Sequence, residues 1–391
     1  MARLRSGDGY WEIAQDGAKL VIVDGGKQST RKFVSPTHAK VQHDKLVADK
    51  LAAGWELTDE PAPVIDTGEP KNPELEAAFA ADPYDASVAA VYGDWLQSRG
   101  HPRGELIARC LAEARDGADK APPSVRKHLA RHREQLIGEL THFDAPDDDS
   151  PFTWRNGFIR RLDLTDANDA VQLVRAVLAH PSGRFLTEAR IRFNGADAIA
   201  EALEALRPAK LRELAILSYS APPQLDVLAS FTQLRKLVVK CDGNAVLGRP
   251  ALAGIANLPP SVESLAVHAG CDDHWFALRP LFERNDVHLG ELSLGLGAGI
   301  RVAIHALADG PLAARIVTLE VADDPEMWVR AFREQRERFA KLELLKLLVG
   351  HTAQGALAAL RGVVKRVLPS RDLYTELMPE HDDDYFDEVR E

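Results

Sequence analysis

Two histidines in the first half of the chain have a spacing that could bind a metal ion. His128 and His132 are four residues apart, so on a helix both rings would project from one face, as two zinc ligands do. His142 lies close enough along the chain to supply a third ligand, but a zincin has Glu directly after the first His, where Leu129 stands. Flanking Arg and Lys residues would repel a cation. We therefore expect an exposed basic helix over residues 124–140 and no metal.

A second cluster could exchange protons. Asp94, His101 and Glu105 lie close together in the sequence and are of the types that act as general acids and bases. No nucleophile, metal-ligand set or phosphate-binding loop accompanies them. Asp94 and Glu105 could instead receive the guanidinium of Arg103 as buried charge-assisted pairs. We expect this structural role.

Three glycines late in the chain suggest a nucleotide site. Gly295, Gly297 and Gly299 follow a predicted strand and precede a predicted helix, but Ile300 stands where the dinucleotide fingerprint needs its third glycine. The sequence also lacks a Gly-x-Ser-x-Gly elbow, a P-loop and a Cys-x-x-Cys pair. We therefore expect no catalytic residues, no cofactor and no enzyme activity.

The elements that would position these residues are dominated by a repeat. The pattern apolar-x-x-apolar-x-apolar recurs eight times at steps of 23 to 28 residues, as in Leu211, Leu214 and Ile216, with a partial ninth copy at Val364. Alternation along a strand would bury Leu214 and Ile216 and turn the residues between them to the opposite face. In several of the segments that connect one strand to the next, here called returns, the apolar residues have helical spacing. The copies begin at Ile159, Leu186, Leu211, Leu234, Val262, Leu289, Ile316 and Leu342.

This pattern and its period resemble leucine-rich repeats, and the helical returns resemble the ribonuclease-inhibitor-like subtype. The resemblance implies an α/β fold: a solenoid of parallel strands with helical returns over residues 149–370. The family often has an Asn three residues after the last apolar position of a copy. In this chain only Asn194 stands at such a position.

In leucine-rich repeat proteins the strand face usually binds the partner. Here that face is basic in its first copies, which favours a protein with an acidic segment; ordinary surface charge is the alternative. The expected partner-binding residues are Arg161, Arg190, Arg192, Lys236, Lys240, His268, Glu291, Glu320 and Lys346.

Residues 1–60 resemble a WGR domain, a small α+β module. Trp11-Glu12-Ile13, Phe33-x-Ser35, the helix with Lys50-Leu51, and Gly54-Trp55 match its order. Residues 24–28 occupy the place of the Trp-Gly-Arg signature and contain neither Trp nor Arg. The family's signature region helps to contact nucleic acid. The residues that could contact nucleic acid here are Lys27, Arg31 and Lys32, although they could equally form a solvated face.

Residues 72–148 form a predicted helical domain that resembles the bacterial repeat-companion domain. The matching motifs are Tyr92-Gly93-Asp94-Trp95-Leu96 and Gly100-His101-Pro102-Arg103-Gly104-Glu105, where His101 replaces the usual Asp. That family accompanies leucine-rich or similar repeats. Residues 61–71, rich in Pro and Gly, form a predicted linker. The acidic tail, 371–391, could fold back on the basic strand face.

Composition limits the function further. The 391 residues carry a formal net charge of −11, which disfavours a general nucleic-acid or membrane binder. Three scattered cysteines, no signal-peptide core and no long apolar stretch favour a cytoplasmic protein that does not enter membranes, and the composition is typical of a bacterial protein. We expect a non-enzymatic scaffold or adaptor that binds protein. The alternative is a nucleic-acid-associated regulator that uses the WGR-like domain and the basic half of the solenoid.

Overall fold

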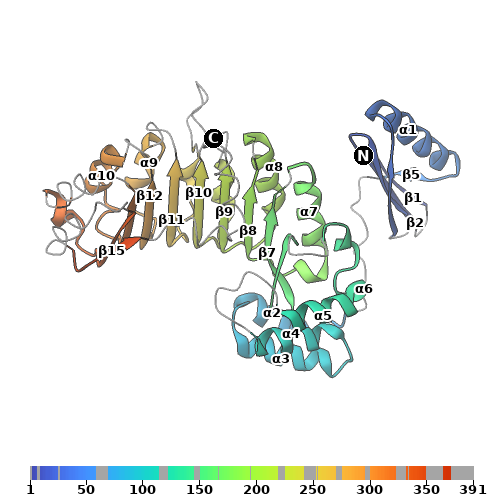
Figure 1. Ribbon diagram of the computed structural model, residues 1–391, viewed down its shortest axis with the longest axis horizontal. Coiled ribbons are helices and arrows are strands. Elements are labelled where there is room, and N and C mark those ends of the chain that lie inside the picture. The colour runs from blue at the N-terminus through green and yellow to red at the C-terminus, as the bar shows by residue number, and fades with distance from the viewer. Residues whose placement is uncertain are drawn as a thin grey trace, which may run out of the picture. The chain divides into compact units, whose positions relative to one another are not determined.

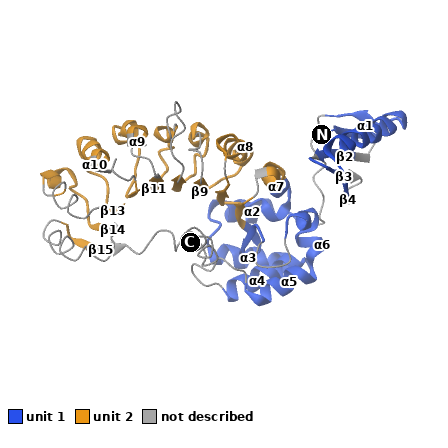
Figure 2. Ribbon diagram, turned by 45° about the horizontal axis from the view of Figure 1, so that its top comes forward, with its two compact units in different colours: residues 1–159, 176–185 blue, residues 160–175, 186–391 orange. Residues whose placement is uncertain are grey.

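The computed structural model forms two compact units. One consists of residues 1–159 with 176–185, and the other of residues 160–175 with 186–391 (Figure 2). The structure describes residues 2–6, 9–24, 27–58, 69–113, 122–144, 150–165, 167–193, 195–218, 225–241, 252, 254–269, 275–295, 300–322, 332, 334–348 and 364–370.

The first unit begins with a five-stranded antiparallel sheet in the order β4-β3-β2-β1-β5. Ser35 caps the following helix by accepting a hydrogen bond from the His38 backbone N–H, and Pro36 is its first residue. The core between sheet and helix includes Trp11, Ile13 and Leu20. The elements are β1 (Ala2–Ser6), β2 (Gly9–Asp16), β3 (Lys19–Asp24), β4 (Lys27–Lys32), α1 (Pro36–Ala52) and β5 (Glu56–Leu57).

The buried side of α1 is narrow. Val41 and Leu51 are apolar but 58% and 40% exposed. Ala39 is fully buried instead, and Leu46 and Val47 pack at the margin of the core. A short side chain lets the helix lie close to the sheet, so the buried stripe is narrower than the apolar pattern indicated.

Five short helices follow within the same unit. Phe79 and Tyr92 pack with Phe158 and Phe185 in one aromatic core. The helix expected over 124–140 is broken into two helices and a 3-10 turn, with Gly138 at φ +51°. The elements are α2 (Pro73–Ala81), α3 (Ala86–Gln97), α4 (Pro102–Ala112), α5 (Pro123–Arg131), α6 (Arg133–Leu136) and η1 (Gly138–His142).

A ten-stranded, mostly parallel sheet fills the rest of the chain (Figure 1), and its described strands do not close into a barrel. Strands β7 to β14 coincide with the eight predicted copies, and β15 with the partial ninth. β6 lies beside β7 at the end of the sheet. The strands are β6 (Phe152–Arg155), β7 (Phe158–Leu164), β8 (Glu188–Arg192), β9 (Glu213–Ser218), β10 (Lys236–Cys241), β11 (Ser264–Ala269), β12 (Glu291–Gly295), β13 (Thr318–Ala322), β14 (Leu344–Leu348) and β15 (Arg366–Ser370).

The returns between strands include helices and shorter 3-10 turns. Helices α8, α9 and α10 lie on one side of the sheet (Figure 2), against the buried Leu, Ile and Val side chains of the repeated pattern. The regular returns are α7 (Ala167–Ala179), η2 (Pro181–Gly183), α8 (Ala196–Leu206), η3 (Asp226–Ser230), η4 (Ile255–Asn257), α9 (Trp275–Phe282), α10 (Ile300–Asp309) and η7 (Arg336–Arg338).

A backbone hydrogen-bond ladder fixes where each strand begins. The Arg235 carbonyl accepts hydrogen bonds from the backbone N–H groups of Glu263 and Ser264, at 2.8 and 2.9 Å. The same two-to-one arrangement recurs at the entry of the neighbouring strands. The accepting carbonyls in this ladder belong to Thr187, Arg212, Arg235, Glu263, Gly290 and Val317.

Gly104 tests the helix packing in the first unit. A Cβ at this position would lie 2.6 Å from the Gln97 nitrogen and the Gly93 carbonyl oxygen, and neither backbone atom can move away freely. We expect Gly104→Ala to destabilise the unit by about 1–3 kcal/mol in urea denaturation, because overpacking strains the crossing of α3 and α4.

Gly290→Ala is the matched control, because its Cβ would meet no atom nearer than the Glu263 carbonyl oxygen at 4.0 Å. Equal unfolding midpoints for the two variants would contradict the proposed close crossing.

Candidate functional site

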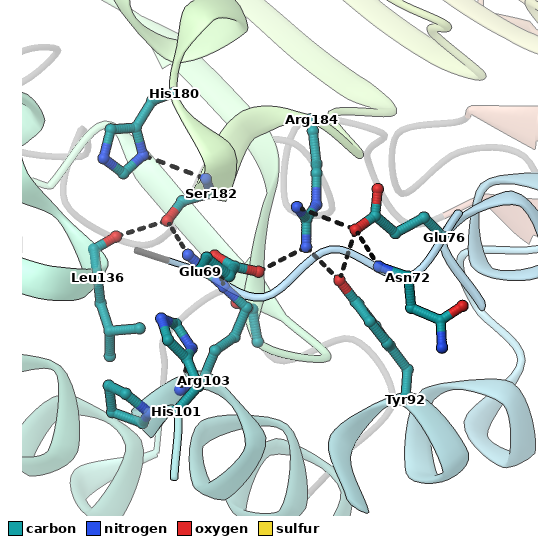
Figure 3. Close-up of polar contacts among 12 residues, drawn as sticks. Glu69, Asn72, Glu76, Tyr92, His101, Arg103, Leu136, His180, Ser182 and Arg184 are labelled. Atoms are coloured by element: carbon teal, nitrogen blue, oxygen red, sulfur yellow. Dashed lines mark hydrogen bonds and ion pairs between the residues drawn. The ribbon is translucent and has the colours of Figure 1, made fainter. Parts of the chain in front are cut away.

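A fully buried arginine organises the most extensive polar cluster of the first unit (Figure 3). Arg103, at the start of α4, donates from Nε to Glu69 Oε2 at 2.8 Å. Its two terminal nitrogens donate to the Gly157 carbonyl oxygen at 2.8 Å and to Ser182 Oγ at 2.9 Å. The side chain therefore joins segments that are far apart in sequence.

Glu69 is shared between two guanidinium groups. Arg184 Nη2 donates to Glu69 Oε1 at 2.6 Å and also contacts the Tyr92 hydroxyl, while its Nη1 lies 3.6 Å from Glu76 Oε1. The Tyr92 hydroxyl donates in turn to Glu76 Oε1 at 3.3 Å (Figure 3). Two carboxylates thus neutralise two arginines.

Burial and charge act in opposite directions on these groups. Burial would raise the pKa of Glu69, but the charges of Arg103 and Arg184 outweigh it and hold the pKa below its ordinary value. Burial raises the pKa of Tyr92, so its hydroxyl stays protonated. Glu69 is therefore ionised and Tyr92 neutral at pH 7.

Two neutral histidines border the cluster, and each caps a helical turn. His101 Nδ1 accepts a hydrogen bond from the Arg103 backbone N–H, and His180 Nδ1 accepts one from Ser182. Burial lowers the pKa of both imidazoles, to about 4 for His180, and the nearby Arg103 charge acts in the same direction. His101 therefore caps the first turn of α4 with a ring nitrogen, as the side-chain oxygen of an Asp could do.

The predicted partners of Arg103 were wrong. Asp94 is exposed, and Glu105 is largely exposed and pairs with Arg109 on its own helix. Asp94, His101 and Glu105 therefore do not converge on an acid–base site. Glu69 was not predicted as a partner, because it falls in the segment expected to be a linker, residues 61–71. A lone acidic residue before a helix gave no signal that it would be buried.

The two histidines of the predicted basic helix do not form a metal site with their described neighbours. The His128 and His132 rings lie 4.6 Å apart between centroids. His128 is buried, which corrects the expectation of a wholly exposed helix face, and its Nε2 hydrogen-bonds to the Pro102 carbonyl oxygen at 2.9 Å. Within the described ranges, no group of three or more His, Cys, Asp or Glu side chains could hold a metal ion.

On the strand face of the large sheet, parallel register aligns side chains into rows. The middle row begins and ends with charged residues and is apolar in its centre, over β9 to β11. From β7 to β14 it contains Asp163, Arg190, Ala215, Val238, Ala266, Ser293, Glu320 and Lys346.

The centre of this face is already buried. Ala215, Leu217, Val238 and Ala266 form a hydrophobic cluster, with Leu217 only 2% exposed. They lie opposite to the core residues that alternate with them in the same strands. A partner cannot gain apolar contact there, so the accessible part of the predicted surface lies at the margins.

The predicted partner-binding residues differ in accessibility. Two are buried: Arg161, 3.2 Å from Asp163, and Glu320, 4.0 Å from Lys346. Lys236 and Glu291 are exposed, and the others are partly exposed: Arg190, Arg192, Lys240, His268 and Lys346.

His268 is held along the face of the sheet. Its Nε2 lies 3.1 Å from Ser293 Oγ on the next strand. The ring lies over Gly295, because a Cβ there would come within 2.7 Å of His268 Nδ1. His268 and Ser293 thus place a hydrogen-bonded pair of polar side chains beside the apolar centre.

A groove lies at the amino-terminal edge of four strands, β10 to β13. Its volume is about 390 Å³, and it includes Lys236 and Glu291 from the predicted set. The other lining residues were not predicted as partner-binding residues, and they lie in the two rows at the starts of the strands. They are Arg235, Glu263, Ser264, Gly290, Val317 and Thr318.

The predicted nucleic-acid residues lie on the edge strand β4 of the small sheet. Arg31 and Lys32 are exposed, and Lys32 pairs directly opposite Lys19 on β3. Lys27 begins this strand, but its side chain lies outside the described part. Lys50, another cation of this domain, lies over the Trp55 ring at 4.1 Å from the ring centroid. Its charge therefore makes a cation–π contact within the domain.

Some predictions fall outside the described residues. These are the glycines at 297 and 299, Asn194 and the acidic tail over 371–391. Among the described helices, none is long and apolar enough to cross a membrane.

Comparisons with known proteins assign no family. No protein-family model matches the chain, and no curated protein matches it. Among solved structures, it is similar to the crystal structure of a Bacteroides fragilis protein from the Northeast Structural Genomics Consortium. The two are 12% identical, with a TM-score of 0.41, over 94% of this chain and 95% of the other.

Replacing Glu69 with Gln tests the arginine cluster. The substitution keeps the shape but leaves the buried Arg103 and the partly buried Arg184 with one carboxylate, so we expect it to cost about 3–5 kcal/mol in the free energy of unfolding. Glu105→Gln, at the position predicted from sequence, should cost less than about 1 kcal/mol because its ion pair is exposed. If urea denaturation showed a larger loss of stability for Glu105→Gln than for Glu69→Gln, Glu105 would be the partner of Arg103 after all.

Acid should destabilise the first unit through His180. The pKa of its imidazole is about 4 in the folded chain and 6.5 ordinarily, so the unfolded chain binds the proton first. The contribution, about 3 kcal/mol, is complete above pH 6.5 and is lost as the pH falls through 4.

His180→Asn supplies the control, because its side-chain oxygen can still cap Ser182 but does not titrate. Unfolding free energies measured from pH 7 to 4.5 should fall less for this variant. If the unfolding free energies of the variant and the unchanged chain fell in parallel with pH, His180 would have an ordinary pKa in the folded chain.

Proposed function

We propose that the chain is a non-enzymatic scaffold or adaptor that binds another protein through a leucine-rich repeat solenoid. The observation that carries the proposal is the strand face: successive parallel strands, in register, present aligned side-chain rows while α8, α9 and α10 lie on the other side. Such a face offers contacts over many strands at once.

The solenoid assignment is supported by how the copies stack. Each predicted copy coincides with one strand, and the strands follow one another in chain order through the sheet. A single strand and its return cannot enclose a core, so each copy depends on its neighbours, as in leucine-rich repeats.

The same proposal covers the two amino-terminal modules. Packing of Lys50 against Trp11 and Trp55 supports the WGR-like assignment of residues 1–60, because all three residues belong to the matching motifs. Residues 72–148 would be a repeat-companion domain, since Arg103 and Gly104 of its motif have structural roles in the buried cluster and the α3–α4 crossing. We propose a cytoplasmic location, which suits a chain with only three cysteines.

Partner contact would use the accessible margins of the strand face and the edge groove. Arg190 and Arg192 on β8 and Lys240 on β10 place positive charge on two strands and would favour an acidic segment. The overall charge of −11 opposes general binding to a phosphate backbone.

Binding of nucleic acid is the second candidate, and one observation favours it. Lys32 and Lys19 lie directly opposite each other on β4 and β3, and both are exposed. Like charges at paired positions repel, so an anion between them would be stabilising. With Arg31 beside them, these side chains would contact phosphates.

A tagged chain, retrieved from native lysate with and without nuclease, tests both candidates. We expect a stoichiometric protein partner that survives nuclease and is lost with the double variant Arg192→Glu, Lys240→Glu. The control Arg175→Glu, Lys210→Glu reverses two exposed charges away from the strand face and should retain it.

Two results would overturn the scaffold proposal. One is recovery of nucleic acid alone, abolished by nuclease and by Arg31→Glu, Lys32→Glu, which would establish the second candidate. The other is a partner that both double charge variants retain or lose equally.

A further inference from the structure

The edge groove exists where one residue lacks a side chain. Arg235, Glu263, Gly290 and Val317 occupy equivalent places immediately before β10, β11, β12 and β13. Gly290 needs no special conformation, because its φ lies outside the left-handed region and a Cβ would meet nothing nearer than 4.0 Å. The fold would accept a larger residue here, and glycine leaves the hollow of about 390 Å³ open.

Two charged side chains in the groove, Lys236 and Glu291, remain available to a ligand, and they have opposite signs. Arg235 and Glu263 lie 4.0 Å apart and largely offset each other. Neither Lys236 nor Glu291 makes an ion pair with a described residue, and both are exposed. They stand two strands apart, which is about 10 Å at the usual strand spacing.

The two charges are followed by an apolar surface. Ser264 lies between Lys236 and Glu291 on the intervening strand. Beyond Glu291, Val317 is 38% exposed and Thr318 begins the next strand. The row of Lys236 therefore runs positive, neutral polar, negative and neutral polar, and the apolar Val317 lies on the fourth strand, one residue before Thr318.

We propose that this groove binds an extended peptide segment of the partner in which an acidic, a small polar, a basic and an apolar residue follow in that order. The inference rests on the scaffold function proposed above and identifies the chemistry of its ligand. The acidic residue pairs with Lys236, the basic residue with Glu291, and the apolar residue packs on Val317. The small polar residue lies over Ser264, and the basic residue passes over Gly290, which leaves room for its side chain to reach Glu291.

Other ligand classes fit the groove less well. A phosphate backbone would meet the carboxylate of Glu291, which repels it. A purely apolar segment would cover both exposed charges without pairing them, at a desolvation cost. A segment with both charges satisfies both side chains, and its order relative to the apolar residue fixes its direction.

Calorimetry with the full chain and two blocked peptides tests the proposal. The matching probe contains Asp-Ser-Lys-Ala-Leu, and the control Lys-Ser-Asp-Ala-Leu has the same composition. We expect the matching probe to bind more tightly by about tenfold, since exchanging the charges converts two attractions to repulsions. Gly290→Leu should abolish binding, whereas Gly290→Ala should weaken it.

A charge exchange in the protein supplies the second variant. Lys236→Glu with Glu291→Lys should invert the preference, so that the control peptide binds more tightly. Equal binding of the two peptides, no binding of either, or binding that Gly290→Leu leaves unchanged would overturn the inference. A lysate partner retained by Gly290→Leu but lost with Arg192→Glu, Lys240→Glu would show that the scaffold proposal holds while the groove inference fails.

Discussion

Neighbour-to-neighbour backbone pairing is the constraint on which the large sheet depends. A single strand such as β10 is too short to enclose a hydrophobic core by itself. It becomes stable only when it pairs with β9 and β11. Parallel pairing requires a connecting segment of many residues between strands, and the side chains of Leu237 and Val239 on β10 are fully buried. The regular spacing of the copies is therefore a consequence of packing.

The first unit depends on a different kind of interaction. Arg103 is a charged side chain without solvent contact, so it must be neutralised and hydrogen-bonded or the unit would be destabilised. Glu69, Gly157 and Ser182 meet this requirement from three separate segments. Such a cluster contributes less to net stability than to the choice of one arrangement, because any other arrangement leaves a buried charge without a partner.

The strands of the large sheet could be predicted because local pattern and tertiary packing agree. In Leu211-x-x-Leu214-x-Ile216, alternation and period both follow from the short strand that packs in the structure. The buried side of α1 was less predictable, because Val41 is apolar but faces solvent.

The site residues were harder to derive from sequence. Register placed Lys236 and Glu291 at an accessible edge and Glu320 in a buried position, although all three alternate correctly along their strands. Glu69 and Gly290 had no local signal at all. The role of Glu69 depends on residues up to 115 positions away, and that of Gly290 on side chains from neighbouring strands. Pairwise contacts of this range do not leave a pattern in one sequence.

The ladder at the strand entries also bears on how such a chain can vary over generations. Two successive N–H groups anchor each strand to one carbonyl of the strand before it, independently of how long the intervening return is. An insertion or deletion in a return is absorbed before the next anchor and does not shift the strands that follow. One added residue within a strand would instead exchange its buried and accessible faces. Differences in length should therefore accumulate in the returns, where the steps already range from 23 to 28 residues.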